Sequence, residues 1–368
     1  MKKLFFIAAA ALMLAAACTK TEVNAPDNRI GFMPVNQLTT KVTGSVFPTS
    51  EVFGTYAWTK GTAGEFFIDN KIVSYQNPYW TTSTPYYWPK NQTVDFFSYY
   101  PHNTSGVPAV SKTQISYTDI DYTANQVDYM YADKAVAFTD NANDVDDGVN
   151  AFTGVPTIFR HAGSKVKVNI ILGENEKTEV DGTVTKWEVT LKSVALSGIY
   201  IKGTCVLNLS DAEAKGIVPW SKPQDSEGYY VWTADTNLTN DTDNALYKNV
   251  QHYDLVRNEG VPVIPEVYML PQTLASGQQM IHLLFDVKTY RKAPGETDFN
   301  LTLTQSDITA SADLLIDTHD LNEIRAWQMN QSIVYNITLG PAGKQITFDP
   351  AIDQWENKTV STNIDLVI

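Results

Sequence analysis

The sequence is poor in cysteine, with only Cys18 and Cys205 among its 368 residues. Two cysteines allow at most one disulfide, which excludes a scaffold held together by a disulfide framework. Cys205 lies in 198–209, where apolar residues alternate as they do along one face of a strand. We therefore expect Cys205 to be a small buried apolar residue and not a nucleophile.

The sequence also lacks the residue patterns that carry catalysis or bind metal. Its five histidines are scattered, and no pair has metal-ligand spacing. It contains no G-x-S-x-G turn and no Walker A loop, and no carboxylate pair stands out for glycoside hydrolysis. The acidic loops 140–148 and 235–244 lack EF-hand spacing, which leaves open only calcium binding of another kind. We predict no enzymatic activity, no cofactor and no metal.

Charge is sparse and mostly acidic. Charged residues make up 18% of the chain, and the formal net charge is −14. A body of this charge repels nucleic acid and anionic lipid headgroups. Hydrophobic content of 43% is enough for real cores, so the composition is typical of a folded, exported protein.

One apolar run stands at the N-terminus. Lys2 and Lys3 precede the apolar stretch 4–17, which is too short for a comfortable transmembrane helix. The run ends in Leu14-Ala-Ala-Ala-Cys18, and this ending resembles a bacterial lipobox. We predict a lipoprotein signal peptide over 1–17, lipid attachment at Cys18, and a flexible tether over 18–29.

Helical periodicity is scarce, and only 211–216 and 321–328 are candidates for a short helical turn. A period of two dominates instead, for example in 164–172, 280–287 and 332–339. Such strands, separated by loops rich in Asn, Asp, Thr, Gly and Pro, predict half-buried antiparallel sheets. We expect an all-β chain of two tandem β-sandwich domains, an N-terminal one over 30–178 and a C-terminal one over 179–368.

The segment 86–101 is dense in aromatic residues, which form either a sugar platform or a buried strand. In VDFFSYY, Val94 and Phe96 face one way, whereas Phe97 and Tyr99 face the other. Aromatics on both faces predict a central strand covered on both sides, with Phe96 and Phe97 buried.

The alternative, a glycan-binding surface lipoprotein, requires Trp58 and Trp80 to project together into water. Four other tryptophans lie at strand boundaries, where we expect core or cover residues: Trp88, Trp232, Trp327 and Trp355.

A series of short motifs carries a family resemblance. In order they are IGF (30–32), TK (40–41), VFGTYA (52–57), YWP (87–89), VDFFSYYP (94–101), VDYMYA (127–132), VPTIFRHAGSKV (155–166), YMLPQ (268–272), YNITL (335–339), ITFDP (346–350) and Trp355. Their order over more than three hundred residues, behind the lipobox, resembles the Bacteroidetes fimbrillin-like family.

The resemblance implies two transthyretin-like, Greek-key β-sandwich domains, export as a lipoprotein, and assembly by strand exchange. In the family a trypsin-like protease removes the lipidated N-terminal segment, and in some members a first strand with it. The groove so opened is filled by a strand of another subunit, which is β-augmentation.

This sequence offers two processing sites, Arg29 and Lys41, and it also remains open that neither is cut. Cutting after Arg29 leaves residues 30–32 in place, whereas cutting after Lys41 removes them.

At the C-terminal end, apolar or β-branched residues alternate to the last position, and this segment is either the last strand of its own domain or a donor strand. Its members are Val360, Thr362, Ile364, Leu366 and Ile368.

We therefore expect a fimbrial (pilus) subunit or pilus-associated adhesin at the outer membrane and cell surface. Its expected partners are other fimbrial subunits, in a homo- or hetero-polymer, host or bacterial surface ligands, and the membrane through the lipid before processing, with no nucleic acid. Shaft, tip and anchor roles share these motifs and stay open.

Overall fold

The computed structural model describes most of the folded part of the chain. The described ranges are 29–36, 47–59, 65–77, 79–102, 108–122, 126–138, 154–200, 202–208, 253–317 and 323–340, with the backbone of the short strands 220–221, 229–230, 248–249, 345–347 and 363–365. Within these ranges all regular structure is β-strand. The same residues contain no helix long and apolar enough to cross a membrane.

The N-terminal half forms one eight-stranded sheet that closes on itself. Its order is β2-β3-β4-β1-β10-β8-β5-β9, and the ring closes because β2 also pairs with β5. The strands are β1 (Phe32–Asn36), β2 (Val52–Thr59), β3 (Ile68–Gln76), β4 (Tyr79–Thr82), β5 (Val94–Tyr100), β8 (Met130–Ala132), β9 (Ala135–Phe138) and β10 (Val155–His161).

The C-terminal half is a sandwich of two sheets around one core. One sheet has the order β20-β11-β25, and the facing sheet runs β12-β13-β22-β23, with β18 and β19 also paired to β13. The strands are β11 (Ser164–Leu172), β12 (Glu176–Thr178), β13 (Val184–Ser197), β18 (Lys248–Asn249), β19 (Tyr253–Asp254), β20 (Gly260–Met269), β22 (Met280–Lys292), β23 (Asn300–Asp313) and β25 (Ser332–Leu339). The alternating burial predicted for 164–172, 280–287 and 332–339 is confirmed.

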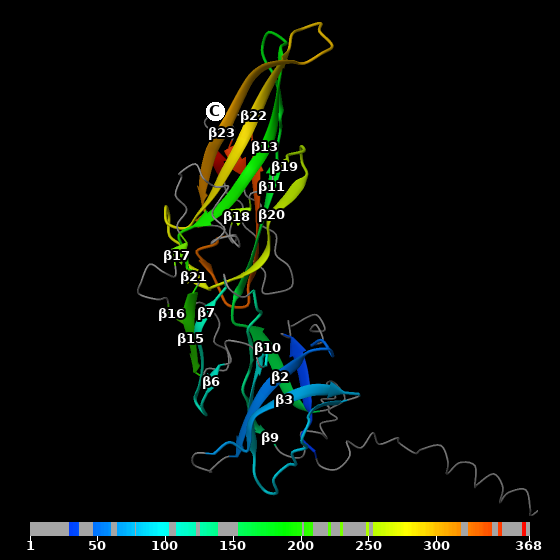
Figure 1. Ribbon diagram of the computed structural model, residues 1–368, viewed down its shortest axis with the longest axis vertical. Coiled ribbons are helices and arrows are strands. Elements are labelled where there is room, and N and C mark those ends of the chain that lie inside the picture. The colour runs from blue at the N-terminus through cyan, green and yellow to red at the C-terminus, as the bar shows by residue number, and fades with distance from the viewer. Residues whose placement is uncertain are drawn as a thin grey trace, which may run out of the picture.

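Smaller sheets complete the fold. A four-stranded sheet of order β16-β15-β7-β6 lies beside the junction of the halves, and three strand pairs, β14–β17, β21–β24 and β26–β27, lie outside the large sheets. These strands are β6 (Ala109–Val110), β7 (Gln114–Asp121), β14 (Ile199–Tyr200), β15 (Lys202–Asn208), β16 (Trp220–Ser221), β17 (Tyr229–Tyr230), β21 (Gln272–Thr273), β24 (Ala326–Trp327), β26 (Gln345–Thr347) and β27 (Asn363–Asp365). Figure 1 shows the elongated result, with the N-terminal sheet at one end and an arm of β13, β22 and β23 at the other.

Strand β5 separates two hydrophobic clusters. Val94 and Phe96 belong to the N-terminal cluster, and Phe97 and Tyr99 belong to a junction cluster. The junction cluster also contains residues far along the chain, namely Cys205, Leu207, Leu270 and Met329. Phe96 and Phe97 are 2% and 1% exposed, so the predicted central strand with two buried faces is confirmed.

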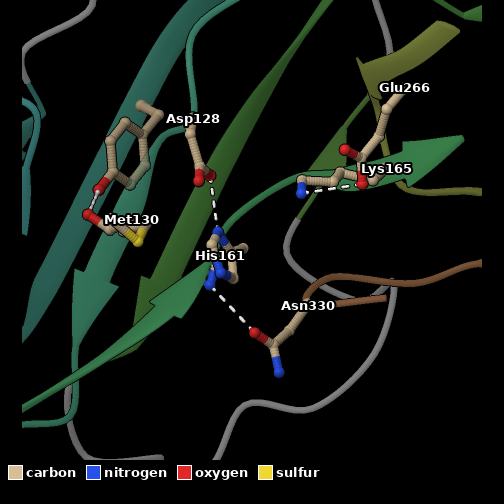
Figure 2. Close-up of polar contacts among 7 residues, drawn as sticks. Asp128, Met130, His161, Lys165, Glu266 and Asn330 are labelled. Carbon is tan, nitrogen blue, oxygen red and sulfur yellow. Dashed lines mark hydrogen bonds and ion pairs between the residues drawn. The ribbon is translucent and has the colours of Figure 1, made fainter. Parts of the chain in front are cut away.

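The two halves meet where β10 passes directly into β11, with only Ala162 and Gly163 between them. Polar contacts surround this point (Figure 2). His161 Nδ1 lies 2.7 Å from Asp128 Oδ1, and the His161 backbone N–H donates to Asn330 Oδ1 at 3.2 Å. A Cβ atom on residue 163 would lie 2.6 Å from the Tyr122 hydroxyl oxygen, so a larger residue here would require the buried Tyr122 ring to shift.

Two expectations about local structure were wrong. The sheets are mixed and not purely antiparallel, because β1 pairs with β10 and β11 pairs with β25 in parallel. The described part of 321–328 is extended and not helical, since Ile324 bridges Ile316 and Trp327 belongs to β24. Burial of Ile324 and Trp327 in the C-terminal core overrides the local preference. The other candidate helical turn, 211–216, lies outside the described residues.

The domain division after residue 178 stays a prediction. Strand β11 precedes that point in sequence, yet it pairs with β20 and β25 of the C-terminal sandwich. The change from one large sheet to the other occurs at Ala162 and Gly163.

Truncating Phe97 is expected to destabilise the whole fold, because its ring is 1% exposed in the junction cluster. We predict that Phe97→Ala lowers the free energy of unfolding by about 3–5 kcal/mol in urea denaturation. The matched control is Val136→Ala, because Val136 is 57% exposed, and we expect a change within about 0.5 kcal/mol. Equal effects of the two variants would contradict the burial of β5.

Acid is expected to destabilise the C-terminal sandwich through His282. The ring lies between the hydroxyls of Ser197 and Ser311, each 2.7 Å away, and burial lowers its pKa from 6.5 to about 4. Between these two pKa values, His282 binds a proton in the unfolded chain but not in the folded chain. The contribution of neutral His282 to the free energy of unfolding is therefore fully present above pH 6.5 and is lost as pH falls toward 4.

We predict that the fall in Tm between pH 7 and pH 5 is smaller in His282→Gln than in the native chain. Discounted for solvent screening, the difference is on the order of 1 kcal/mol, or about 2–4 °C in a scanning calorimeter. Parallel pH profiles of the two proteins would rule out this role for His282.

Candidate functional site: the first strand and its cradle

The first strand, β1, is an integral part of the N-terminal core. Ile30 and Phe32 are 1% and 3% exposed, Pro34 is also buried, and Gly31 and Met33 between them are partly exposed. This period-two burial is what a strand with one inward face requires. The segment enters the sheet through two backbone bonds: Ile30 N–H donates to the Tyr86 carbonyl at 2.9 Å, and Val155 N–H donates to the Gly31 carbonyl at 2.8 Å.

The Phe32 side chain packs into an aromatic cradle formed by Phe53, Phe96 and Trp80. The Phe32 ring lies edge-on against Phe53 and Phe96, with centroid distances of 6.0 and 5.8 Å. Phe32 also stands opposite Trp80 of β4 in the sheet register. Edge-to-face pairs contribute about 0.5–1.5 kcal/mol beyond area burial, so Phe32 is the main anchor of β1.

The pairing of β1 is one-sided. Five residues of β1 pair in parallel with Val155–Phe159 of β10, whereas the pairing with β4 is limited to Phe32 and Trp80. Parallel ladders are slightly less stable per residue than antiparallel ones. Because β1 is also the first described strand, it can leave the sheet without drawing another described strand through the fold.

Gly154 allows the close approach of β1 to β10. A Cβ atom at this position would lie 2.8 Å from the Gly31 carbonyl carbon and oxygen and 2.8 Å from the Phe32 nitrogen. All three are backbone atoms, so β1 itself would have to move. Gly154 was not singled out from the sequence, although a glycine directly before a strand is a recognised signal of close backbone approach.

Phe47 fills the same core from the segment that follows β1. It is fully buried, stacks on Phe159 at 4.9 Å, and meets Phe53, Trp80 and Tyr100 edge-on at 5.5–5.7 Å. Phe47 lies after Lys41 in the chain. A cut after Lys41 would therefore remove β1 and leave Phe47 in the chain that contains the large sheets.

The structure places only part of the predicted site. Arg29 is exposed and forms an antiparallel bridge with Tyr87 at the entrance of β1. Cys18 and Lys41 lie outside the described residues, as do Val360, Thr362, Leu366 and Ile368. Ile364 lies in β27, which pairs with β26 of the same chain through Ile346. Processing, lipid attachment and strand donation all stay predictions.

The sugar-platform alternative was wrong on its own criterion. Trp58 and Trp80 are 5% and 7% exposed, so neither projects into water. Trp58 has Lys134 over its ring at 4.9 Å, and Trp80 packs against Phe47. Trp88 and Trp327 are buried as expected, whereas Trp232 and Trp355 lie outside the described residues.

The Cys205 thiol and the possible metal ligands form no reactive site among the described residues. Cys205 is fully buried, and burial raises the pKa of its thiol far above the usual range, as expected for an apolar core residue. No group of three or more His, Cys, Asp and Glu side chains within the described ranges could hold a metal ion.

These features define an all-β protein of several sheets, in which the first described strand packs into a buried core and pairs mainly through one parallel ladder. A model of the fimbrillin-like family matches residues 40–355. The chain therefore belongs to the fimbrillin-like family. The match begins after β1 and covers the rest of the large sheets.

Solved structures give further comparisons. A candidate cell adhesion protein from Bacteroides uniformis has 14% identity, with 92% of this chain and 99% of that chain covered and a TM-score of 0.42. One from Parabacteroides distasonis has 11% identity, with 92% and 99% covered and a TM-score of 0.43. A fimbrial protein from Bacteroides ovatus has 10% identity, with 85% and 50% covered and a TM-score of 0.29. No curated protein matches the chain.

We predict that Gly154→Ala loosens β1 and exposes the bond after Arg29 to trypsin. The steric conflict with Gly31 and Phe32 is expected to cost about 1–3 kcal/mol of β1 docking. Cleavage then becomes about tenfold faster, because proteolysis follows the population of the opened strand. Mass spectrometry of the released N-terminal peptide measures the rate.

The matched control is Gly260→Ala at an edge strand, where the new Cβ would meet only the Ile171 side chain at an ordinary 3.7 Å. Its cleavage rate should equal that of the native chain. An unchanged rate in Gly154→Ala would show that β1 is not held by this contact.

Proposed function

We propose that this protein is a fimbrial subunit or fimbria-associated adhesin of the cell surface, anchored first by lipid on Cys18 and assembled by strand exchange through the β1 cradle. The observation that carries the proposal is the position of β1. It fills a buried aromatic groove, yet it is joined to the rest of the sheet mainly by one parallel ladder.

Removal of β1 creates an acceptor with defined chemistry. The edge of β10 from Val155 to Phe159 loses its partner, and pockets open where Ile30, Phe32 and Pro34 were buried. An incoming strand restores the backbone hydrogen bonds and fills those pockets with every second side chain. The groove therefore selects an extended segment with apolar residues at alternate positions.

The C-terminal segment of a second copy has that pattern. Val360, Thr362, Ile364, Leu366 and Ile368 share one parity, and the strand face that they form needs burial. The described part of this segment pairs with β26 in its own chain. We propose that it leaves β26 and enters the groove of the next subunit, which makes each shaft subunit both donor and acceptor.

The two processing sites give different products. Cleavage after Arg29 frees the body from its lipid but leaves Ile30 and Phe32 in the core, so no groove opens. Cleavage after Lys41 removes β1 entirely while Phe47 stays behind. A shaft subunit therefore requires the cut after Lys41, and an uncut chain with lipid on Cys18 serves as an anchor.

The proposal is tested on protein taken from fibres at the cell surface. We predict that mass spectrometry finds Val42 as the N-terminus of the assembled subunit, and that Lys41→Ala abolishes polymerisation while Arg29→Ala does not. The C-terminal deletion of 361–368 should block addition of the next subunit but leave the Tm of the monomer nearly unchanged.

Two results would contradict strand exchange. One is a fibre built of subunits that still carry Ile30 at their N-terminus. The other is normal polymerisation of the chain that lacks 361–368. A deletion variant that unfolds would show instead that the tail belongs to its own domain.

A further inference from the structure

The outer edge of β23 is a second interaction surface, remote from the cradle. Among the described residues, β23 pairs only with β22, and it is the last strand of its sheet. All five residues from Asn300 to Thr304 are exposed, and Leu301 and Leu303 are 55% and 50% exposed. The strand lies on the arm at the end of the molecule that is far from β1 (Figure 1).

The outer edge of β23 lacks two of the features that normally prevent strand pairing, charge and proline, over one stretch, although its register with β22 shifts at Thr302 and again between Gln305 and Ile308. Soluble proteins protect edge strands with charge, proline or short length, because unpaired backbone groups attract other strands. The segment from Asn300 to Ser306, NLTLTQS, contains no charged residue and no proline. Alternating Leu and Thr give it high strand propensity.

Other edges of the C-terminal sandwich do carry such protection. Strand β20 contains Pro262, Pro265 and the exposed Glu266, and β12 is three residues long with Glu176 and Lys177. Strand β25 is uncharged, but it has no exposed side chain and lies against β26. Within the described sandwich, β23 is therefore the long edge with an exposed and uncharged stretch, Asn300–Ser306.

We propose that the β23 edge binds the β23 edge of a second copy of this chain, as an antiparallel pair across a two-fold axis near Leu303 and Thr304. A neutral segment is compatible with self-pairing, because a two-fold axis places the same segment of the two copies side by side. A charged edge would be repelled by its own copy at this point, whereas NLTLTQS is not.

The charges at the two ends of the segment fit the same arrangement. At one end, Asp307 is 66% exposed and shares Lys192 with Asp286, which leaves one net negative charge. At the other end, Arg291 stands opposite Asn300 in the register, and Lys292 follows it. Antiparallel pairing places Asp307 of one copy opposite Asn300 of the other, with Arg291 one strand further from the contact.

Glu296 and Asp298 belong to the turn before Asn300 and lie outside the paired segment. The contact uses no residue of β1 or β10, so it forms whether or not strand exchange takes place. In a fibre it would join subunits side by side.

The test is analytical ultracentrifugation of the full chain, with Cys18→Ser in every variant so that lipid cannot cause association. We expect the parent chain to dimerise reversibly with concentration. Leu303→Lys and Leu303→Glu should each weaken dimerisation at least tenfold, because each places two like charges beside the axis. An equimolar mixture of these two variants should dimerise again.

The matched control is Val180→Lys, which replaces an exposed apolar residue of the same arm at the β12–β13 turn. It should dimerise as the parent does, and circular dichroism should show equal strand content in all variants. A parent that stays monomeric, including one that binds a strand of a different protein, overturns the proposal. So does an unchanged Leu303→Lys, or a mixture that remains monomeric.

Discussion

The burial of both faces of β5 is the constraint on which the rest of the structure depends. Its even-numbered side chains form one wall of the N-terminal core, and Phe97 and Tyr99 form one wall of the junction cluster. Removal of a strand that contributes side chains to both clusters would disrupt both of them. A strand can therefore leave the fold at small cost only if its side chains pack in one cluster.

Strand β1 meets that condition. Ile30 and Phe32 belong to the N-terminal cluster, and no side chain described between Ile30 and Pro34 belongs to the junction cluster. In the proposed mechanism, withdrawal of β1 would open one side of β5 and leave Phe97, Tyr99 and their partners packed. An incoming strand would then bind to an ordered groove, without the entropic cost of ordering the whole N-terminal half again.

Two neutral side-chain amides add hydrogen bonds beside the hydrophobic junction cluster. The Gln126 side chain donates to the Tyr268 carbonyl at 3.1 Å and accepts from the Tyr268 N–H at 2.6 Å. Gln272 pairs in the same way with both backbone groups of Tyr200, at 3.1 and 3.0 Å. Each amide thus makes the two backbone hydrogen bonds that a neighbouring strand would otherwise make. Because amides do not titrate, these contacts keep their strength across the pH range in which His282 loses its own contribution.

The sequence predicted what is local and periodic. The alternation in 164–172 and the two-faced pattern around Phe96 and Phe97 are properties of consecutive residues, and both were confirmed. Pairing between Phe32 and Val155 is not local, because more than one hundred residues separate the partners and either strand could have lain at an edge. The same holds for Gln126 and Tyr268, whose contact depends on the crossing at Gly163. For Cys18, Lys41 and most of the C-terminal segment, the chemistry is read from the sequence alone.

In the proposed mechanism, β1 can be removed from the N-terminal sheet without unfolding the rest. Hydrogen–deuterium exchange of the chain before and after release of residues 1–41 is the decisive measurement. We expect the amides of Val155 and of Thr157–Phe159 to lose protection, while those of Val166–Leu172 in β11 and of Phe97 and Tyr99 keep it. Loss of protection throughout β5 would contradict this mechanism, because β1 would then be needed for the fold. Unchanged protection of Val155–Phe159 would contradict it too, because no acceptor edge would have opened.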